Sequence, residues 1–154
     1  MTHYFAYGSN MDRAAMRKRC PTARALGPAV LHGWRFMIMT SGYGSIAPRA
    51  GACVHGVLWR LAPRDLAALN AYEALDSGLY RRRMLTVLAE RRRRRALVFV
   101  GRRHGEGRPR PGYMGLVVAA ARGWNLPARY VRALARWSPS ALPAARAPET
   151  GEIR

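Results

Sequence analysis

The sequence predicts a single α+β domain, and three observations favour this class. The chain has 154 residues, of which 49% are hydrophobic, so it is long enough and apolar enough to form one buried core. Apolar runs of strand length recur between residues 4 and 101. Apolar residues at helical spacing occur between those runs and again after residue 113, with no internal repeats. We therefore expect strands and helices that share one core.

The first element is the apolar run at residues 4–7, Tyr-Phe-Ala-Tyr, which predicts a buried strand. Gly8, Ser9 and Asn10 favour a turn, and residues 11–19 have helical spacing. A strand that ends at glycine before a helix directs backbone N–H groups and a positive dipole toward an anion. Such a turn can bind a carboxylate, a phosphate or a developing oxyanion. The alternative, which spacing alone favours, is an ordinary strand–turn–helix with Asn10 as N-cap.

The next elements run from residue 21 to residue 69. Pro21 ends the first helix, and the Gly-Pro pair at 27–28 opens a strand region. The remaining expectations are a core strand at 34–40, a turn at 41–45, a short edge segment at 46–48, and a strand at 54–61. His55 lies in that last strand without a nearby acid, which favours a structural histidine. Pro63 and Asp65 begin a helix whose buried face carries Leu66 and Leu69.

The second half of the chain predicts a hairpin followed by two helices. Residues 84–90 and 96–101 read as strands, with the arginine run 91–95 as a solvated turn between them. Residues 104–112 predict a loop, and helices are expected at 113–122 and 127–137. Residues 138–154 are rich in Pro, Ala and Ser, so we expect a folded domain over 1–137 and a loosely ordered tail over 138–154.

The composition limits the possible partners and compartments. The formal net charge is +19 and Lys18 is the only lysine; arginine and alanine are enriched along the whole chain, which favours a compositional bias over a nucleic-acid surface. Non-specific attraction of polyanions and of small anionic substrates is expected all the same. Cys20 and Cys53 lack metal-ligand spacing and disulfide density, which is typical of reduced thiols in a cytoplasmic protein. We expect no secretion signal and no membrane span, because no apolar run approaches ~18 residues.

Glu73 is the acid that the sequence leaves without a structural task. It follows the helix that begins at Pro63 and has Tyr72, Ala74 and Leu75 as neighbours. Desolvation among these residues would raise the pKa of its carboxyl, as a proton-transfer group requires. The alternative is a solvated acid at a helix end. The other acids are assigned to capping, turns, loops or the tail: Asp12, Asp65, Asp76, Glu90, Glu106, Glu149 and Glu152.

Three separated motifs resemble the gamma-glutamylcyclotransferase-like family. Residues 5–11, Phe-Ala-Tyr-Gly-Ser-Asn-Met, are similar to its N-terminal signature, with Met11 where leucine is common. Residues 69–73, Leu-Asn-Ala-Tyr-Glu, followed by Ser-Gly-Leu-Tyr at 77–80, resemble the helix that leads to its catalytic glutamate. The link at 74–76 is less glycine-rich than in the family. The third match is Tyr113 ahead of an apolar helix, so the resemblance covers roughly residues 4–137.

This resemblance implies a fold, a reaction and a site. The fold is a small mixed β-barrel flanked by helices. The reaction releases 5-oxoproline from a gamma-glutamyl amine, dipeptide or metabolite when the substrate's α-amine attacks its own γ-carbonyl, and it requires no metal and no cofactor. Glu73 would act as general base and then as general acid. The implied substrate-binding residues are Tyr4, Phe5, Ala6, Tyr7, Gly8, Ser9 and Tyr113.

Three alternatives remain at this point. A basic binding module of the same fold, with a vestigial site, would bind nucleic acid or an acidic partner. A hydrolase at the same site would release free glutamate. Ser9 as a nucleophile is disfavoured, because no histidine is linked to it and the glycine-flanked serine turn of the hydrolases is missing. Sequence does not decide the leaving amine or the oligomeric state.

Overall fold

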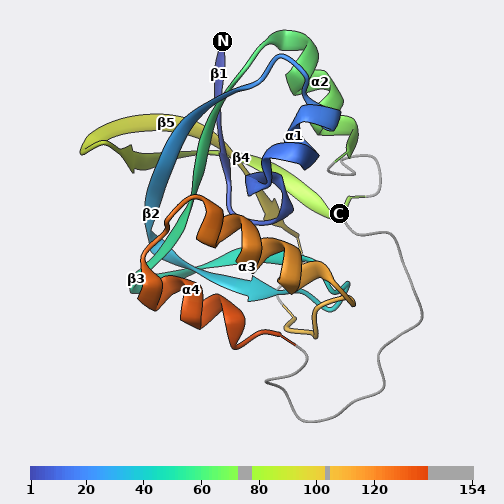
Figure 1. The fold of residues 1–154 in the computed structure, drawn as a ribbon, viewed down its shortest axis with the longest axis vertical. Coiled ribbons are helices and arrows are strands. Elements are labelled where there is room, and N and C mark those ends of the chain that lie inside the picture. Colours follow the sequence, from blue (N-terminus) through green and yellow to red (C-terminus); the bar gives the residue numbers. More distant parts are fainter. Residues whose placement is uncertain (73–77, 103–104, 139–154) are drawn as a thin grey trace.

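The computed structural model describes residues 1–72, 78–102 and 105–138. Within these ranges five strands close into a barrel in the order β1-β3-β2-β4-β5: β1 (Thr2–Ala6), β2 (Arg24–Ile38), β3 (Gly44–Leu61), β4 (Tyr80–Ala89) and β5 (Arg92–Gly101) (Figure 1). Neighbouring strands are antiparallel except β1 and β5, which pair in parallel at Tyr4 and Leu97. The expected small mixed barrel is therefore confirmed.

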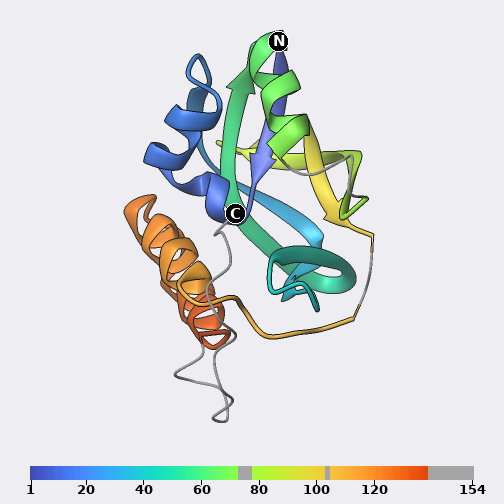
Figure 2. The ribbon, with the colours of Figure 1, turned by 90° about the vertical axis from the view of Figure 1, so that its right-hand side faces the viewer.

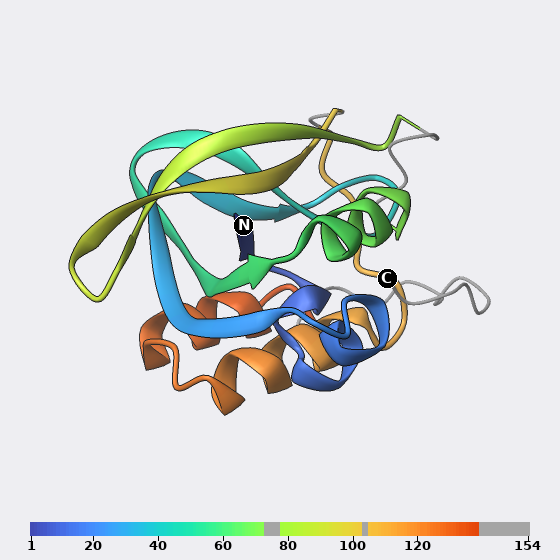
Figure 3. The ribbon, with the colours of Figure 1, turned by 90° about the horizontal axis from the view of Figure 1, so that it is seen from above.

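The helices lie outside the barrel. They are the 3₁₀ helix η1 (Ser9–Met11) and the α-helices α1 (Arg13–Arg19), α2 (Pro63–Tyr72), α3 (Tyr113–Gly123) and α4 (Ala128–Ala135). Two perpendicular views show α1, α3 and α4 on the same side of the barrel, with α3 beside α4 (Figures 2 and 3). The interior is apolar, and its fully buried side chains include Phe5, Met11, Ile46, Leu58 and Leu61.

β2 and β3 are longer than the sequence pattern indicates. They pair without a break in strand assignment from Arg24 opposite Arg60 to Ile38 opposite Gly44, and bulges absorb the irregular register. The short segment expected at 46–48 is thus part of an 18-residue strand. Pro48 lies opposite Trp34 of β2, in a part of β3 that β1 does not pair with, since β1 pairs only with Val57–Leu61. Proline is tolerated in a strand segment that has a partner on one side only.

The hairpin of β4 and β5 is confirmed, but its turn is shorter than expected. Glu90 and Arg91 form the turn with φ angles of 51° and 64°, the values of a two-residue type I′ turn. Arg92–Arg95 belong to β5 and pair with residues 86–89 of β4. The prediction of a solvated turn over 91–95 was wrong for these four residues, because positive φ at two residues without glycine or asparagine leaves no sequence signal.

The remaining expectations are met in part. Both cysteines are free thiols, with Cys20 buried and Cys53 half-buried. Residues 139–154 of the expected tail lie outside the described residues. In the part of the chain that the structure describes, no helix is both long enough and apolar enough to cross a membrane.

Candidate active site

A small cavity opens where β1 ends, beside the β2–β3 turn and the start of α3. Its volume is about 30 Å³. It is lined mainly by aromatic side chains and glycine backbone: Tyr4, Tyr7, Gly8, Ser9, Asn10, Tyr43, Gly44, Tyr80, Phe99 and Tyr113. The lining residues belong to six elements, β1, η1, β3, β4, β5 and α3, or to the connections next to them.

The loop after β1 forms one wall of this cavity. The carbonyl of Gly8 accepts a hydrogen bond from Met11 N at 3.1 Å, and the carbonyl of Ser9 accepts one from Asp12 N at 3.1 Å. These two bonds form η1. As at the start of any helix, the backbone N–H groups of Gly8 and Ser9 have no acceptor within the turn. The predicted strand–turn–helix is present at the predicted place.

Asp12, rather than Asn10, is the N-cap of α1. Its carboxylate accepts a hydrogen bond from Ala15 N at 2.9 Å. Asn10 is instead buried in the cavity wall, where its Nδ2 donates to the Tyr4 hydroxyl at 3.1 Å. Its Oδ1 accepts a hydrogen bond from the Arg19 guanidinium. The alternative that makes Asn10 a cap is therefore wrong, because its amide bonds to side chains of β1 and α1.

Tyr113 closes the cavity from the side of α3. It follows Gly112, whose φ of 80° turns the chain into the helix, and only 3% of its surface is exposed. Its hydroxyl accepts a hydrogen bond of 3.0 Å from the N–H of Gly44. A Cβ at either Gly8 or Gly44 would lie 2.7 Å from that hydroxyl oxygen. Both positions need glycine because of this close approach.

The other tyrosines of the cavity are tied to the backbone. The Tyr7 hydroxyl donates to the carbonyl of Phe99 at 2.5 Å, and the Tyr80 hydroxyl donates to the carbonyl of Gly44 at 2.7 Å. The ring of Tyr43 packs edge-on against Tyr113 with centroids 5.8 Å apart. Because bonded aromatic side chains have few accessible rotamers, these walls are pre-organised.

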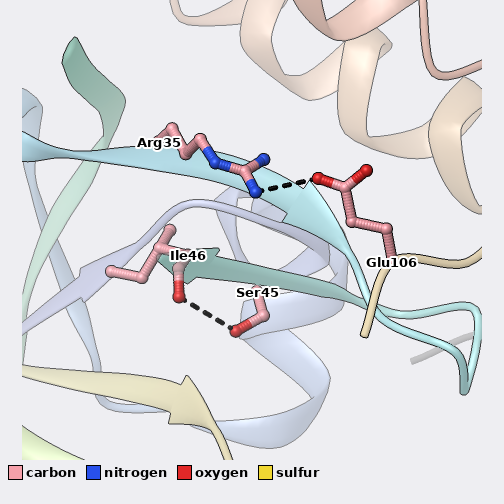
Figure 4. A network of polar contacts seen from close by, with 4 residues as sticks. All are labelled: Arg35, Ser45, Ile46 and Glu106. Carbon is pink, nitrogen blue, oxygen red and sulfur yellow. Dashed lines mark hydrogen bonds and ion pairs between the residues drawn. The ribbon is translucent and has the colours of Figure 1, made fainter. Parts of the chain in front are cut away.

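Polar contacts beyond the cavity hold the segments that form it (Figure 4). Ser45 Oγ accepts a hydrogen bond from Gly101 N at 2.9 Å and donates to the carbonyl of Ile46 at 3.4 Å. Arg35 pairs with Glu106 at 2.8 Å, which ties the connection before α3 to β2. The same connection bonds through Gly107 N to the carbonyl of Ile38 at 2.8 Å.

The structure brings together five of the seven predicted substrate-binding residues, namely Tyr4, Tyr7, Gly8, Ser9 and Tyr113. Phe5 and Ala6 are buried in β1 but do not line the cavity. The Phe5 ring lies on the side of Gly56, where an added Cβ would meet it at 2.9 Å. Alternation along a strand explains why Phe5 points away from the cavity that Tyr4 lines.

Glu73, the predicted catalytic residue, lies outside the described residues. The last described residue before it is Tyr72, at the end of α2. The guanidinium carbon of Arg19 lies 3.7 Å from the centroid of the Tyr72 ring. Since Arg19 also bonds to Asn10, a direct chain of contacts joins the end of α2 to the cavity wall.

Sequence reasoning missed five lining residues: Asn10, Tyr43, Gly44, Tyr80 and Phe99. Tyr80 stood within a recognised motif and Asn10 within the first turn, so both had a usable signal. Tyr43, Gly44 and Phe99 reach the cavity only because the barrel closes, with β1 between β3 and β5. No local pattern reports that closure.

His55 does not line the cavity. It is half-buried in β3, its ring centroid lies 4.9 Å from that of Tyr130, and its Nε2 lies 3.6 Å from Cys53 Sγ. Burial, and to a smaller degree the positive charge of His32, lower the pKa of His55 below its ordinary value of 6.5. Burial likewise raises the pKa of the Tyr130 hydroxyl.

Comparison with known proteins gives a family and a fold. The family model described as gamma-glutamyl cyclotransferase, AIG2-like matches residues 4–116, which is more than half of the chain. A search of the curated proteins found no match.

Among solved structures, one described as a gamma-glutamyl cyclotransferase has a TM-score of 0.83 at 22% identity, covering 99% of this chain and 93% of its own. An uncharacterized protein, loc79017 from Homo sapiens, matches with the same TM-score, identity and coverage. A yeast gamma-glutamyl cyclotransferase specific to glutathione has a TM-score of 0.61 at 12% identity, covering 91% of this chain and 96% of its own. At these identities the structural matches show a shared fold.

Proposed function

Because this chain belongs to the gamma-glutamyl cyclotransferase, AIG2-like family, we propose that it releases 5-oxoproline from a gamma-glutamyl amine, dipeptide or related metabolite. The observation that carries the proposal is the cavity in which the Gly8–Ser9 loop faces the Tyr113 hydroxyl across glycine backbone. That loop and Tyr113 are the two described parts of the site that the sequence motifs indicate.

The proposed reaction needs little from the protein beyond orientation and proton transfer. The substrate's α-amine attacks its γ-carbonyl, a new C–N bond closes the five-membered ring, and the bond to the leaving amine breaks. When the protein holds the glutamyl chain in this geometry, the intramolecular attack becomes much faster, because the reacting atoms are already close and aligned. The rigid aromatic walls around Tyr7, Tyr80 and Tyr113 support that role.

Two groups would handle charge during the reaction. We assign to Glu73 the transfer of a proton from the α-ammonium to the departing nitrogen. The chain of contacts from Asn10 through Arg19 to Tyr72 supports this assignment, because Glu73 is the next residue after Tyr72. The N–H groups at Gly8 and Ser9 would stabilise the oxyanion of the tetrahedral intermediate.

Direct detection of the product tests the proposal. The protein is incubated with a panel of gamma-glutamyl amines and dipeptides, and 5-oxoproline is measured by mass spectrometry. Glu73→Gln should lose most of the activity, since general acid–base catalysis contributes about 10²–10⁴-fold. Asp76→Asn is the matched control, an acid three positions further on that should stay near wild type. Release of free glutamate instead of 5-oxoproline would establish the hydrolase alternative.

One observation favours a second function, a basic binding module of this fold. Arg92, Arg93 and Arg95 are exposed on β5, in a hairpin that projects from the barrel in two views (Figures 1 and 3). This function predicts tight binding of DNA or RNA that weakens steeply with salt. Binding that persists at physiological salt, together with no product from the substrate panel, would establish it in place of the enzyme.

A further inference from the structure

A second hollow, here called the α1 cleft, is formed by α1, its connection to β2, and single residues of β2 and β3. Its lining includes Arg13, Met16 and Arg17 of α1, Ala25 of β2 and Trp59 of β3. None of its lining residues lines the candidate active site. Its volume is about 200 Å³. One water needs only about 10–15 Å³ of such volume, so the cleft has room for a small organic molecule.

Two arginines of α1 lie on the same side of this cleft. Arg13 and Arg17 are four residues apart, so their side chains are neighbours on one face of the helix. The guanidinium carbon of Arg13 lies 3.7 Å from the centroid of the Trp124 ring, at the end of α3. Trp124 is itself held, because its Nε1 donates to the carbonyl of Met11 at 2.7 Å. Stacking on this ring therefore keeps the charge of Arg13 at the cleft.

No acid of the described ranges neutralises this pair. The acids there are Asp12, Asp65, Glu90 and Glu106, and none of them lines the cleft. Asp12 caps α1, Asp65 is hydrogen-bonded to Thr22, Glu106 pairs with Arg35, and Glu90 lies in the β4–β5 turn. Two like charges one turn apart on a helix repel each other. An anion bound between them would remove that repulsion.

The inner wall of the cleft carries a donor without an acceptor. Trp59 is only 5% exposed, and its Nε1 has no hydrogen-bond partner among the described residues. Its ring packs edge-on against Trp124 with centroids 6.2 Å apart, so it belongs to the same aromatic cluster as the Arg13 stack. Buried donors in folded proteins are nearly always paired, and one that is not indicates a missing water or ion. An acceptor is thus what the arginines and the indole share a need for.

The charge of the α1 cleft favours one class of anion. A phosphate monoester carries nearly two negative charges near neutral pH and has three acceptor oxygens. Two guanidinium groups match both, since each presents its N–H donors in a planar fork. A carboxylate carries one charge and would leave one guanidinium without an anion. The remaining lining includes Met16, Pro21, Ala23 and Ala25, apolar side chains that suit the organic part of an ester.

We propose that the α1 cleft binds a small phosphate monoester through Arg13 and Arg17, with the phosphate close to the indole N–H of Trp59. This binding site is separate from the proposed active site and does not depend on the proposed reaction. It also differs from general attraction of anions to a chain of net charge +19, because it requires two particular arginines.

Calorimetric titration of the whole protein at about pH 7.5 and about 0.15 M salt tests the site, since this salt screens long-range attraction. The probes are phenyl phosphate, phenyl sulfate, which has the same shape but a single charge, and inorganic phosphate. The site variant is Arg13→Gln with Arg17→Gln. The control is Arg132→Gln with Arg136→Gln, two exposed arginines with the same spacing at the end of α4. Thermal unfolding without ligand reports on folding separately.

We expect one phenyl phosphate to bind per chain, about tenfold more tightly than phenyl sulfate and more tightly than inorganic phosphate. The site variant should weaken binding by about 10–100-fold, the effect of losing hydrogen bonds to a charged group. The control variant should stay within about twofold of the wild type. In NMR spectra the indole N–H resonance of Trp59, assigned with Trp59→Phe, should shift on binding, whereas those of Trp34 and Trp137 should not.

Four results would overturn the proposal. Absence of binding at this salt concentration would remove the site altogether. An equal loss in the site and control variants would show that phenyl phosphate is attracted only by overall charge. A Trp59 resonance that does not move while phenyl phosphate binds would place the ligand elsewhere. Equal affinity for phenyl sulfate or for inorganic phosphate would refute the assignment to a phosphate monoester.

Discussion

The hydroxyl oxygen of Tyr113 occupies the space that a side chain at Gly8 would fill. A Cβ at Gly8 would lie 2.7 Å from this oxygen. Glycine is therefore needed there for space. The same oxygen accepts the hydrogen bond from Gly44 N, so one atom ties α3 to two loops of the barrel.

A double-mutant cycle tests this relationship. Gly8→Ala should lower the free energy of unfolding by about 1–3 kcal/mol through overpacking. Tyr113→Phe should cost about 1–3 kcal/mol, because the buried Gly44 N–H loses its acceptor. In the double variant the alanine at Gly8 has more room because the hydroxyl is gone. The loss in the free energy of unfolding should therefore be smaller than the sum of the losses in the two single variants. Urea denaturation of the four proteins measures the coupling, and additivity within about 0.5 kcal/mol would refute it.

Arg19 should affect catalysis more than folding. It joins Asn10 in the cavity wall to the ring of Tyr72, the residue before Glu73. Arg19→Met keeps the apolar stem but removes the guanidinium, and we expect a decrease of about tenfold in kcat. Lys18→Met, at an exposed neighbouring position, is the control for charge and should match the wild type. Steady-state kinetics of 5-oxoproline formation compares kcat of Arg19→Met and of Lys18→Met with that of the wild type.

Asp65 should be the most costly helix cap to remove. Its buried carboxylate accepts hydrogen bonds from the Thr22 hydroxyl at 2.5 Å and from Ala62 N at 3.3 Å. Asp65→Ala leaves both donors without this acceptor and should cost about 2–3 kcal/mol in the free energy of unfolding. Asp12→Ala, which removes the partly buried cap of α1, should cost about 1 kcal/mol. Equal losses in chemical denaturation would contradict the ranking.

His55 should make stability depend on pH on the acid side. Its pKa is lowered in the folded state, so below about pH 6.5 the unfolded chain binds more protons than the folded one. The contribution of His55 to the free energy of unfolding is fully present above about pH 6.5, and it is lost as the pH falls from there through the lower pKa of the folded state. The groups that face it are Cys53, His32 and Tyr130.

Urea denaturation at about pH 7.5 and about pH 5.5 measures this dependence. His55→Gln should lose less stability on acidification than the wild type. His32→Gln should raise the pKa of His55, followed by its ring proton shifts in NMR, because the neighbouring positive charge is removed. An unchanged titration in His32→Gln would show that burial alone is responsible.

Local patterns were sufficient for most elements. The aromatic run of β1, the glycine turn after it, and the Pro63–Asp65 start of α2 were all recognised, since each depends on neighbouring residues alone. The patterns failed where the barrel imposed the structure. The length of β3 through Pro48 depends on its pairing with β2, and the turn at Glu90 and Arg91 depends on the twist of the two strands.

The sequence by itself determined the family, the order of strands and helices, and the part of the cavity wall formed by Tyr4, Tyr7, Gly8 and Ser9, because these features depend on residues that are neighbours in the chain. Only the tertiary structure decided that Tyr43, Gly44 and Phe99 complete the cavity and that Phe5 faces away from it. The physical reason is the closure of the barrel. Pairing β1 with both β3 and β5 brings together residues far apart in the chain, and no local propensity encodes that distance.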